Sequence, residues 1–301
     1  MRAPRLLLLA LLTSCSTAPH GAASDAASTD AARSTNPFAP QPDESEGLTN
    51  TSADLDTLLE HGALAGACDR YRAGQTDRKT LLTCGKWMFF YESFGTFGMP
   101  SALVKFTAQN FPDQLGLGFA KLGMVPDPSS ADHLPLGLGP TTPYSGNIEA
   151  LAFTCASCHF AQLPDGRYSV GAPNHRFEYG SAILALTVAP LVGTGLSQAS
   201  AHDPAAIAKI QPVLDALAAD STLKNQFLLA LLPLASVSMP SMSTTVEHAY
   251  STWPRGALDF MIAPLPVDDG IETVSKMIGL WGLPRPAEIA SSGMSSRIVA
   301  T

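Results

Sequence analysis

Residues 155–159 have the sequence Cys155-Ala156-Ser157-Cys158-His159, in which two cysteines stand three positions apart and a histidine follows directly. On a helix this spacing puts the two thiols about one turn apart, with the imidazole beside them. A C-x-x-C-H pattern is typical of c-type haem attachment, in which the thiols add to two vinyl groups and the imidazole binds iron. With five Cys and seven His in the chain, chance produces the pattern roughly 0.002 times. We therefore expect one covalent haem c on Cys155 and Cys158, with His159 as an axial iron ligand.

Two other kinds of site use a similar cysteine pair. A thioredoxin-type pair lies at a strand-to-helix turn in a βαβ unit, and a zinc site needs a second pair of ligands nearby. The residues around the motif instead suit a macrocycle, because apolar side chains lower the local dielectric and so tune a redox potential. These flanking residues are Phe153, Phe160, Leu163 and Tyr168.

The sixth iron ligand decides what a haem protein can do, and the sequence leaves it open. His175 is the first candidate, because the turn-rich segment 171–176 can fold back over the haem. His248 is a second, and a Ser/Met/Pro loop offers Met239 or Met242. The remaining alternative is an open or water-occupied site.

The first fifteen residues are typical of an export signal. Arg2 and Arg5 form a positive start, and Leu6–Leu12 is an apolar stretch too short to span a bilayer. The next residues, 12–15, resemble the bacterial lipobox, in which the thiol of the final cysteine, here Cys15, receives a lipid. The alternative is an ordinary signal peptide with an incidental cysteine. We expect an exported protein that is lipid-anchored to the cell envelope, on its periplasmic side or its outer surface.

Charge and the remaining cysteines fit an exported protein. The formal net charge of −8 leaves no basic excess for phosphates, so nucleic acid is not an expected partner. Once Cys15 and the haem pair are set aside, Cys68 and Cys84 remain. In an oxidising compartment a disulfide is the simplest outcome for this pair, and two buried thiols are the alternative.

The chain divides into a polar lead and a helical domain. Residues 16–48 contain few large apolar side chains and are expected to be a disordered tether, so the folded domain spans 49–301. Apolar spacing predicts helices that start near residue 52 and at Pro100. It also predicts helices over 77–91, 147–160, 177–189, 204–219 and 221–232, and no sustained strand pattern. Residues 123–145 are dense in Pro and Gly and are expected to form a long irregular loop. The expected fold class is mainly α, with long Pro/Gly-rich loops.

Three segments together are similar to the di-haem cytochrome c peroxidase superfamily, especially its branch that includes the rubber oxygenases. They are the haem motif with its Pro/Gly-rich lead-in, the segment Trp253-Pro254-Arg255-Gly256-Ala257-Leu258-Asp259, and the stretch Ile278-Gly279-Leu280-Trp281-Gly282-Leu283-Pro284. This resemblance, over about residues 80–285, implies cytochrome-c-like helices around the haem. It also implies that Arg255 and Asp259 lie near the region between two haems, although a plain surface turn is the alternative for this segment.

The chain departs from that superfamily in one respect. A second C-x-x-C-H follows in the family, whereas Cys158 is the last cysteine here. The chain therefore resembles the first haem half alone, so the partner is expected to be a second haem-bearing chain or another redox protein. A domain truncated at its C-terminus is the alternative.

Three functions remain open at this point. The first, which we favour, is an electron-transfer protein with one six-coordinate haem c. The second is a peroxidase- or oxygenase-type oxidoreductase in which His175 or Arg176 polarises an oxygen species on an open iron. The third is a non-catalytic, truncated haem lipoprotein.

Overall fold

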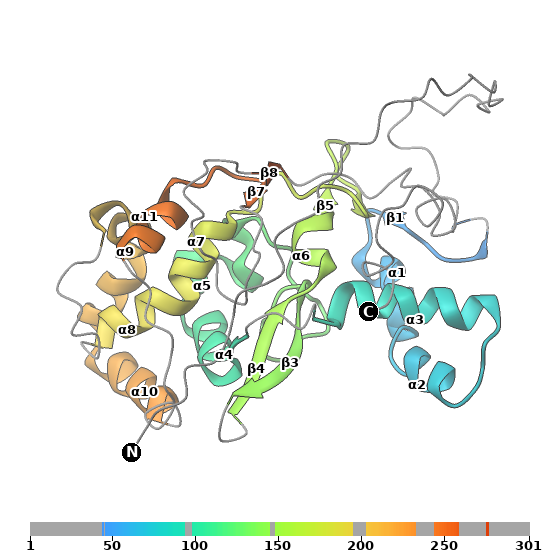
Figure 1. Cartoon of the computed structure of the whole chain (residues 1–301), viewed down its shortest axis with the longest axis horizontal. Coiled ribbons are helices and arrows are strands. Elements are labelled where there is room, and N and C mark those ends of the chain that lie inside the picture. The colour runs from blue at the N-terminus through green and yellow to red at the C-terminus, as the bar shows by residue number, and fades with distance from the viewer. Residues whose placement is uncertain are drawn as a thin grey trace, which may run out of the picture. The chain divides into compact units, whose positions relative to one another are not determined.

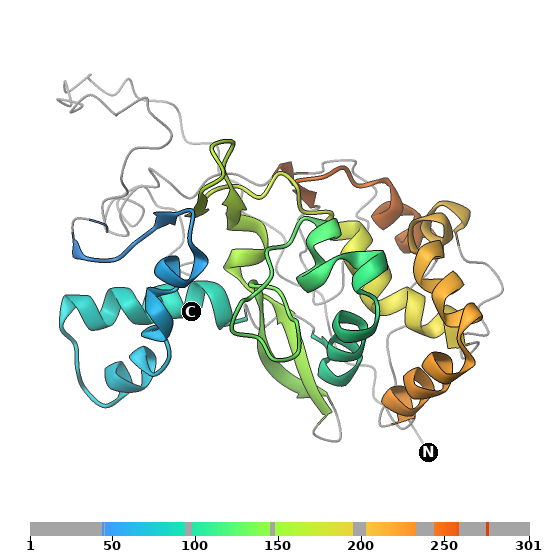
Figure 2. The same ribbon diagram turned by 180° about the vertical axis from the view of Figure 1, so that it is seen from behind.

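The computed structural model describes residues 44, 46–93, 98–144, 148–194, 203–232, 244–258 and 275–276 (Figures 1 and 2). All of them belong to one compact unit, Pro40–Thr301. These residues are mainly helical, with small antiparallel sheets. No helix in these ranges is long and apolar enough to span a membrane.

The helices occur in three groups along the chain. The first group is α1 (Leu55–Leu58), η2 (Glu60–Gly62), α2 (Ala67–Arg72) and α3 (Arg78–Tyr91). The second is α4 (Ser101–Asn110), α5 (Pro112–Leu115), η3 (Leu117–Leu122) and α6 (Cys155–His159). The third is α7 (Tyr179–Ile183), the π-helical turn η4 (Leu184–Val188), α8 (Ala189–Thr194), α9 (Pro204–Ala219), α10 (Ser221–Leu231) and α11 (Thr244–Thr252).

The strands form three small sheets. One has the order β1 (Thr51–Ser52), β6 (Tyr168–Val170), β5 (Phe160–Gln162), and another has the order β2 (Met99–Pro100), β4 (Ile148–Phe153), β3 (Leu138–Tyr144). The third pairs β7 (Ala257–Leu258) with β8 (Ser275–Lys276). Every pairing among the described strands is antiparallel.

Several predicted helices are confirmed, and their ends follow from local chemistry. The carboxylate of Asp77 accepts a hydrogen bond from the backbone amide of Thr80 and so caps α3. Asp203 caps α9 in the same way through the amide of Ala206. The helix predicted near residue 52 is shorter than expected, because Glu60 and His61 have positive φ angles of 56° and 51° that end α1 and separate it from α2.

The helix predicted over 147–160 is wrong, since strand β4 occupies its first half. β4 is the middle strand of its sheet and is buried on both faces from Ala150 to Phe153, so its sequence lacks the alternation of a half-exposed strand. The irregular loop predicted over 123–145 also contains a strand, β3. This strand lies at the sheet edge and contains Pro140 and Pro143. A proline has no backbone N–H to donate, and an edge strand tolerates it because only one side of that strand is paired.

Ordered contacts begin a few residues before position 49, where the tether was expected to end. Leu48 is buried, and the side chain of Glu46 forms an ion pair with Arg78 at 2.5 Å. The predicted signal peptide with Cys15, and the tether up to residue 43, lie outside the described residues.

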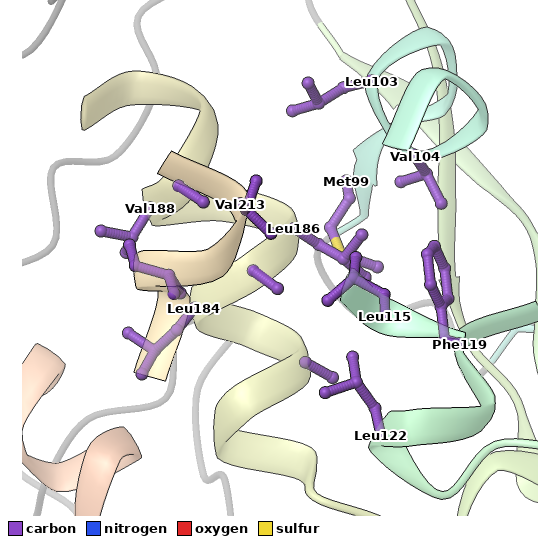
Figure 3. Close-up of a cluster of buried hydrophobic side chains, with 14 of the residues drawn as sticks. Met99, Leu103, Val104, Leu115, Phe119, Leu122, Leu184, Leu186, Val188 and Val213 are labelled. Atoms are coloured by element: carbon purple, nitrogen blue, oxygen red, sulfur yellow. The ribbon is translucent and has the colours of Figure 1, made fainter. Parts of the chain in front are cut away.

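Most of the hydrophobic interior belongs to one group of buried residues, which we call the large core cluster. It joins β2, α4, α5, η3, η4 and α9 through the ten side chains labelled in Figure 3. They are Met99, Leu103, Val104, Leu115, Phe119, Leu122, Leu184, Leu186, Val188 and Val213. The same cluster includes Phe153, Phe177, Tyr179 and Tyr250, which connect it to the strand before the C-x-x-C-H motif.

A second group of buried residues lies nearer the N-terminus, and we call it the small core cluster. Its members are Leu58, Leu59, Leu64, Phe90, Val125, Leu136, Ala156 and Phe160. The residue Ala156 comes from the middle of the C-x-x-C-H motif. The small core cluster therefore holds the motif against α3.

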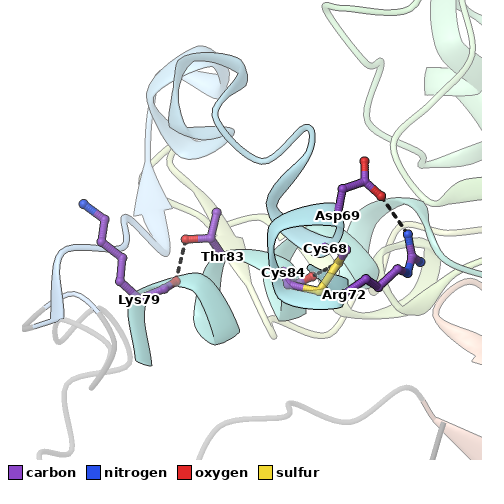
Figure 4. The surroundings of a disulfide bond; sticks show 6 residues. All are labelled: Cys68, Asp69, Arg72, Lys79, Thr83 and Cys84. Atoms are coloured by element: carbon purple, nitrogen blue, oxygen red, sulfur yellow. Dashed lines mark hydrogen bonds and ion pairs between the residues drawn. A yellow bond between two sulfur atoms is a disulfide. The ribbon is translucent and has the colours of Figure 1, made fainter. Parts of the chain in front are cut away.

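Cys68 and Cys84 form a disulfide that joins α2 to α3 (Figure 4), the pairing expected from the sequence. The ion pair between Asp69 and Arg72 lies beside it on α2. A cross-link closing a loop of this length stabilises a fold by roughly 3 kcal/mol on the chain-entropy model.

The cap of α9 predicts how stability depends on pH. Burial alone raises the pKa of the Asp203 carboxyl, but hydrogen bonds from the Ala206 amide and from His248 outweigh it, so the pKa lies below its ordinary value. A lowered pKa adds stability that is present above the unfolded-state pKa of about 3.9 and is lost as the pH falls through the folded-state pKa. Thermal melts should show Asp203→Asn less stable than wild type at pH about 6, with the difference shrinking as the pH falls below the unfolded-state pKa of about 3.9.

The exposed Asp215 on the same helix provides the control. Its carboxylate accepts a hydrogen bond from Gln211 and caps no helix, so Asp215→Asn should lower the melting temperature at pH about 6 much less than Asp203→Asn does. If the difference in melting temperature between Asp203→Asn and wild type stays constant with pH, the negative charge of the Asp203 carboxylate does not stabilise the cap of α9.

Candidate haem-attachment site

Helix α6 is a five-residue segment between β4 and β5, and its N-terminus is fixed by Thr154. The hydroxyl oxygen of Thr154 accepts from the amide of Ala156 at 3.3 Å. The same oxygen lies 3.1 Å from the carbonyl oxygens of both Phe89 and Phe90 at the end of α3. Thr154 is fully buried. One small polar residue therefore begins the motif helix and ties it to α3.

The two sides of α6 differ in burial. Ala156 and Ser157 are 2% and 1% exposed, whereas Cys155, Cys158 and His159 are partly exposed. At 100° per residue the last three side chains lie on one side of the helix, as the C-x-x-C-H spacing requires. Neither thiol is in a disulfide.

The Pro/Gly-rich loop packs directly on the buried side of α6. The Ser157 hydroxyl donates to the carbonyl of Gly137, and the backbone amide of Thr154 donates to the same carbonyl at 2.9 Å. Gly137 has φ +98°, and a Cβ there would lie 2.6 Å from the Ser157 nitrogen. Glycine is needed because another residue would push the loop off the motif helix.

Segment 171–176, which was expected to fold back over the haem, packs against the backbone of α6. The backbone amide of Asn174 donates to the Cys158 carbonyl at 2.8 Å, and its side-chain amide donates to the Ser157 carbonyl at 3.2 Å. A further bond, at 2.9 Å, joins that amide to the carbonyl of Gly123. Asn174 is buried, whereas the next residue, His175, is exposed. The structure thus brings the segment to the motif and leaves the His175 imidazole at the surface.

The predicted apolar flanks belong to two different packing groups. Phe153 contacts Phe177 and Tyr179, with ring centroids 5.6 and 5.2 Å apart, in the large core cluster. Phe160 contacts Phe90 edge-on at 5.0 Å and stacks on Tyr168 at 5.9 Å. Cys158 packs against the large core cluster and Ala156 lies in the small one. The motif helix therefore lies between two aromatic groups.

Leu163 lies outside both groups. It is partly exposed, and its backbone amide donates to the carbonyl of Arg167 at 2.6 Å in the connection between β5 and β6. The structure thus gives Leu163 a role in a turn, not one in the packing beside the motif.

The pKa values of both motif thiols lie above that of an ordinary cysteine. Burial raises the pKa of Cys155, and burial together with the neighbouring Cys155 raises the pKa of Cys158 to about 12. Thioredoxin-type pairs need a lowered pKa instead. The described strands also form no parallel βαβ unit around the motif. Both observations disfavour a dithiol redox site.

A bare metal ion is also a poor fit to the described part of the chain. No group of three or more His, Cys, Asp or Glu side chains in it is arranged to hold one. A haem supplies four nitrogen ligands of its own. Two free thiols to attach it and one imidazole to bind its iron, all on one side of the helix, are therefore sufficient. The donor set and its exposure on α6 therefore fit a covalent haem.

The other candidate residues lie elsewhere. The Nδ1 atom of His248 is 3.0 Å from the carboxylate of the helix cap Asp203, and its side chain is 60% exposed. Arg255 lies in an exposed turn and pairs with Glu178 at 2.5 Å, which agrees with the surface-turn alternative. The exposed side chain of Arg176 lies 3.4 Å from Gln162. Met239, Met242, Asp259 and residues 278–284 are outside the described residues.

Sequence reasoning missed three residues that the structure brings to the site or to its large core cluster: Thr154, Asn174 and Tyr250. Asn174 lies in the turn-rich segment that was singled out for its histidine, so its position was indicated but its role was not. Comparison with family models, with curated proteins and with solved structures finds no match to this chain.

Proposed function

We propose that this chain is a c-type haem protein that transfers electrons. Its haem would be attached covalently to Cys155 and Cys158, and His159 would be an axial ligand of the iron. The observation that supports it best is the arrangement of α6. Both free thiols and the imidazole share its partly exposed side, while Ala156 and Ser157 are buried against the loop and α3. When bound, the haem supplies an iron that cycles between the ferric and ferrous states.

The chain's own residues have defined tasks in this proposal. Thr154 and Gly137 fix the start of α6, and Asn174 holds the end of α6 through the Ser157 and Cys158 carbonyls. Phe153 and Phe160 provide apolar surface on either side of the motif. A site held by buried contacts reorganises little when its charge changes, which suits electron transfer.

The cellular setting is part of the same proposal. A lipid on Cys15 would anchor the protein to the cell envelope, and its partner would be another redox protein or a second haem-bearing chain. The disulfide between Cys68 and Cys84 supports an oxidising compartment.

Peroxidase- or oxygenase-type chemistry is the second candidate. The exposure of His175 and Arg176 favours it, because both side chains lie outside the packed interior, where they would be available to polarise an oxygen species. An open side of the iron is what binding of an oxygen species requires.

Absorption spectroscopy tests the proposal and separates the two candidates. The full chain is produced with the c-type haem maturation machinery, and ferric and ferrous spectra are recorded with and without carbon monoxide. Sharp low-spin bands without a carbon monoxide response support electron transfer. A high-spin ferric form that binds carbon monoxide after reduction supports oxygen chemistry, and a purified chain without covalent haem overturns the proposal.

A histidine pair extends the same experiment to the sixth ligand. If His175 closes the iron, His175→Ala converts the low-spin spectrum to a high-spin one that responds to carbon monoxide. His61, which is also exposed and pairs with Asp56, is the matched control, and His61→Ala should leave the spectrum unchanged.

A further inference from the structure

The outer side of helix α3 is apolar, as its buried side is. At about 100° per residue, one outer side of α3 carries five exposed or partly exposed residues, which are Leu81, Leu82, Gly85, Met88 and Phe89. Leu81 is 43% exposed, and neither Leu81 nor Leu82 packs against a group of buried residues in the described part of the chain. The outer side of a surface helix is ordinarily charged or polar. An accessible apolar side that runs along the helix therefore indicates a contact with something outside the domain.

Basic side chains gather at the N-terminal end of this apolar side. Residues 67–81, which contain α2 and the start of α3, have four basic and two acidic side chains, whereas the whole chain has a formal net charge of −8. The four basic residues are Arg70, Arg72, Arg78 and Lys79. Arg70 and Lys79 are exposed, and neither pairs with an acidic side chain within the described ranges. The disulfide between Cys68 and Cys84 holds α2 beside α3 (Figures 1 and 4), so the basic residues of α2 stay next to that helix.

The acidic side chains of these two helices have other partners or lie elsewhere. Asp69 pairs with Arg72 at 2.9 Å on α2, and the carboxylate of Asp77 accepts from the Thr80 amide at 3.0 Å as the cap of α3. Glu92 follows the last residue of α3, at the opposite end from the basic side chains. The pair of helices therefore keeps an excess of positive charge at one end of its apolar side.

The chain enters the domain at the same end of α3. The side chain of Glu46 pairs with Arg78, the first residue of the helix, and Leu48 is buried two positions later. The predicted tether, which itself lies outside the described residues, thus connects to the domain beside the basic side chains. A lipid on Cys15 would hold this end of the domain near the bilayer, because a linker of that length spans on the order of 30 Å.

A membrane surface is a partner that fits both the charge and the apolar side. Anionic headgroups attract exposed Lys and Arg side chains, and the boundary beneath the headgroups accepts apolar side chains from a helix that lies in its plane. We propose that Arg70, Lys79 and the apolar side of α3, together called the α2–α3 surface, dock the domain on an anionic membrane. This inference rests on the proposed location at the cell envelope, which supplies the bilayer, and it does not depend on haem.

Vesicle binding tests the α2–α3 surface without the lipid anchor. The mature chain from residue 16 keeps every described residue and lacks both the signal and Cys15, so its binding to a bilayer reports its own surface. It is produced with the haem maturation machinery and sedimented with vesicles of phosphatidylcholine alone or mixed equally with phosphatidylglycerol. It should bind the anionic vesicles, less at high salt, and should not bind the neutral ones.

Single substitutions identify the residues that bind. Arg70→Gln and Lys79→Gln should each weaken binding to the anionic vesicles about fivefold, which is the effect of one basic side chain near an anionic surface. Leu81→Ser should weaken binding by about the same factor, because the exposed part of the leucine is no longer buried in the membrane interface.

Lys209→Gln and Leu229→Ser are the matched controls. Lys209 is exposed on α9 and Leu229 is 63% exposed on α10, so each control repeats one substitution on a helix outside the α2–α3 surface. Both controls should bind the vesicles as wild type does. The melting temperature and haem content of every variant show that the fold is retained.

The outcomes keep this inference apart from the proposed function. Failure to bind, equal binding to both kinds of vesicle, or equal losses in the control variants would overturn the docking surface. A dimer in sedimentation that Leu81→Ser dissociates would also overturn it, since a second copy of the chain would then cover α3. Mass spectrometry of the wild-type chain reports the lipid on Cys15, and its absence would overturn the proposed anchor. A loss of vesicle binding confined to the α2–α3 variants supports the docking surface.

Discussion

Cys155→Ala is expected to remove one of the two thioether bonds and to reduce covalent haem strongly, and the double substitution of Cys155 and Cys158 should abolish it. The structure provides the reason, because both thiols are free and lie on the same side of α6 as His159. No other described cysteine is available to replace them, since Cys68 and Cys84 are bonded to each other. Haem staining of denaturing gels and intact-protein mass spectrometry measure the effect directly.

The cysteines of the disulfide give the matched control for this prediction. The double substitution of Cys68 and Cys84 by alanine should keep normal haem content and should reduce stability by roughly 3 kcal/mol. A Cys155→Ala protein with the same haem content as wild type would contradict the assignment of the motif. Loss of haem in both double variants would point to a folding defect common to them.

The long helices could be predicted from the sequence because their signals are local. Asp203 followed by Pro204 at the first helical position marks the start of α9, and the structure begins the helix there. Asp77 marks α3 in the same way. Such caps depend on residues two or three positions away, so no knowledge of the tertiary fold is needed.

The strand before the motif could not be predicted for the opposite reason. β4 is apolar from Ala150 to Phe153 because β2 and β3 flank it and both of its faces are buried. Its pairing with Leu138–Tyr144 joins residues separated by a loop, and that information is not contained in either segment alone. A short apolar run before a helical motif was therefore interpreted as a longer helix.

The candidate site likewise has a part that local sequence predicts and a part that depends on the tertiary fold. The thiols and the imidazole are recognised by their spacing within five residues. The residues that position them come from other segments: Gly137 from the loop before the sheet and Asn174 from the segment after β6. Asn174 donates to backbone carbonyls of the motif, whereas Gly137 accepts through its own carbonyl, and a backbone carbonyl leaves no pattern in the sequence.

Phe160→Ala should be the most destabilising single substitution near the motif, at about 3–5 kcal/mol. Phe160 is 1% exposed, follows His159 directly, and contacts Phe90 and Tyr168 through its ring. Removing the ring leaves a cavity between α3 and the sheet of β5 and β6, and buried surroundings collapse only partly into such a space. Urea unfolding of the full chain measures the loss as a lower midpoint with an unchanged slope.

Substitution of an exposed aromatic residue is the control for this prediction, because it removes a ring without leaving a buried cavity. Tyr71 on α2 is 43% exposed, and Tyr71→Ala should change the free energy of unfolding by no more than about 0.5 kcal/mol. If Phe160→Ala costs as little as Tyr71→Ala, the small core cluster does not hold the motif in place. A large loss confined to Phe160→Ala means that packing directly behind His159 stabilises the segment that carries the proposed haem ligands.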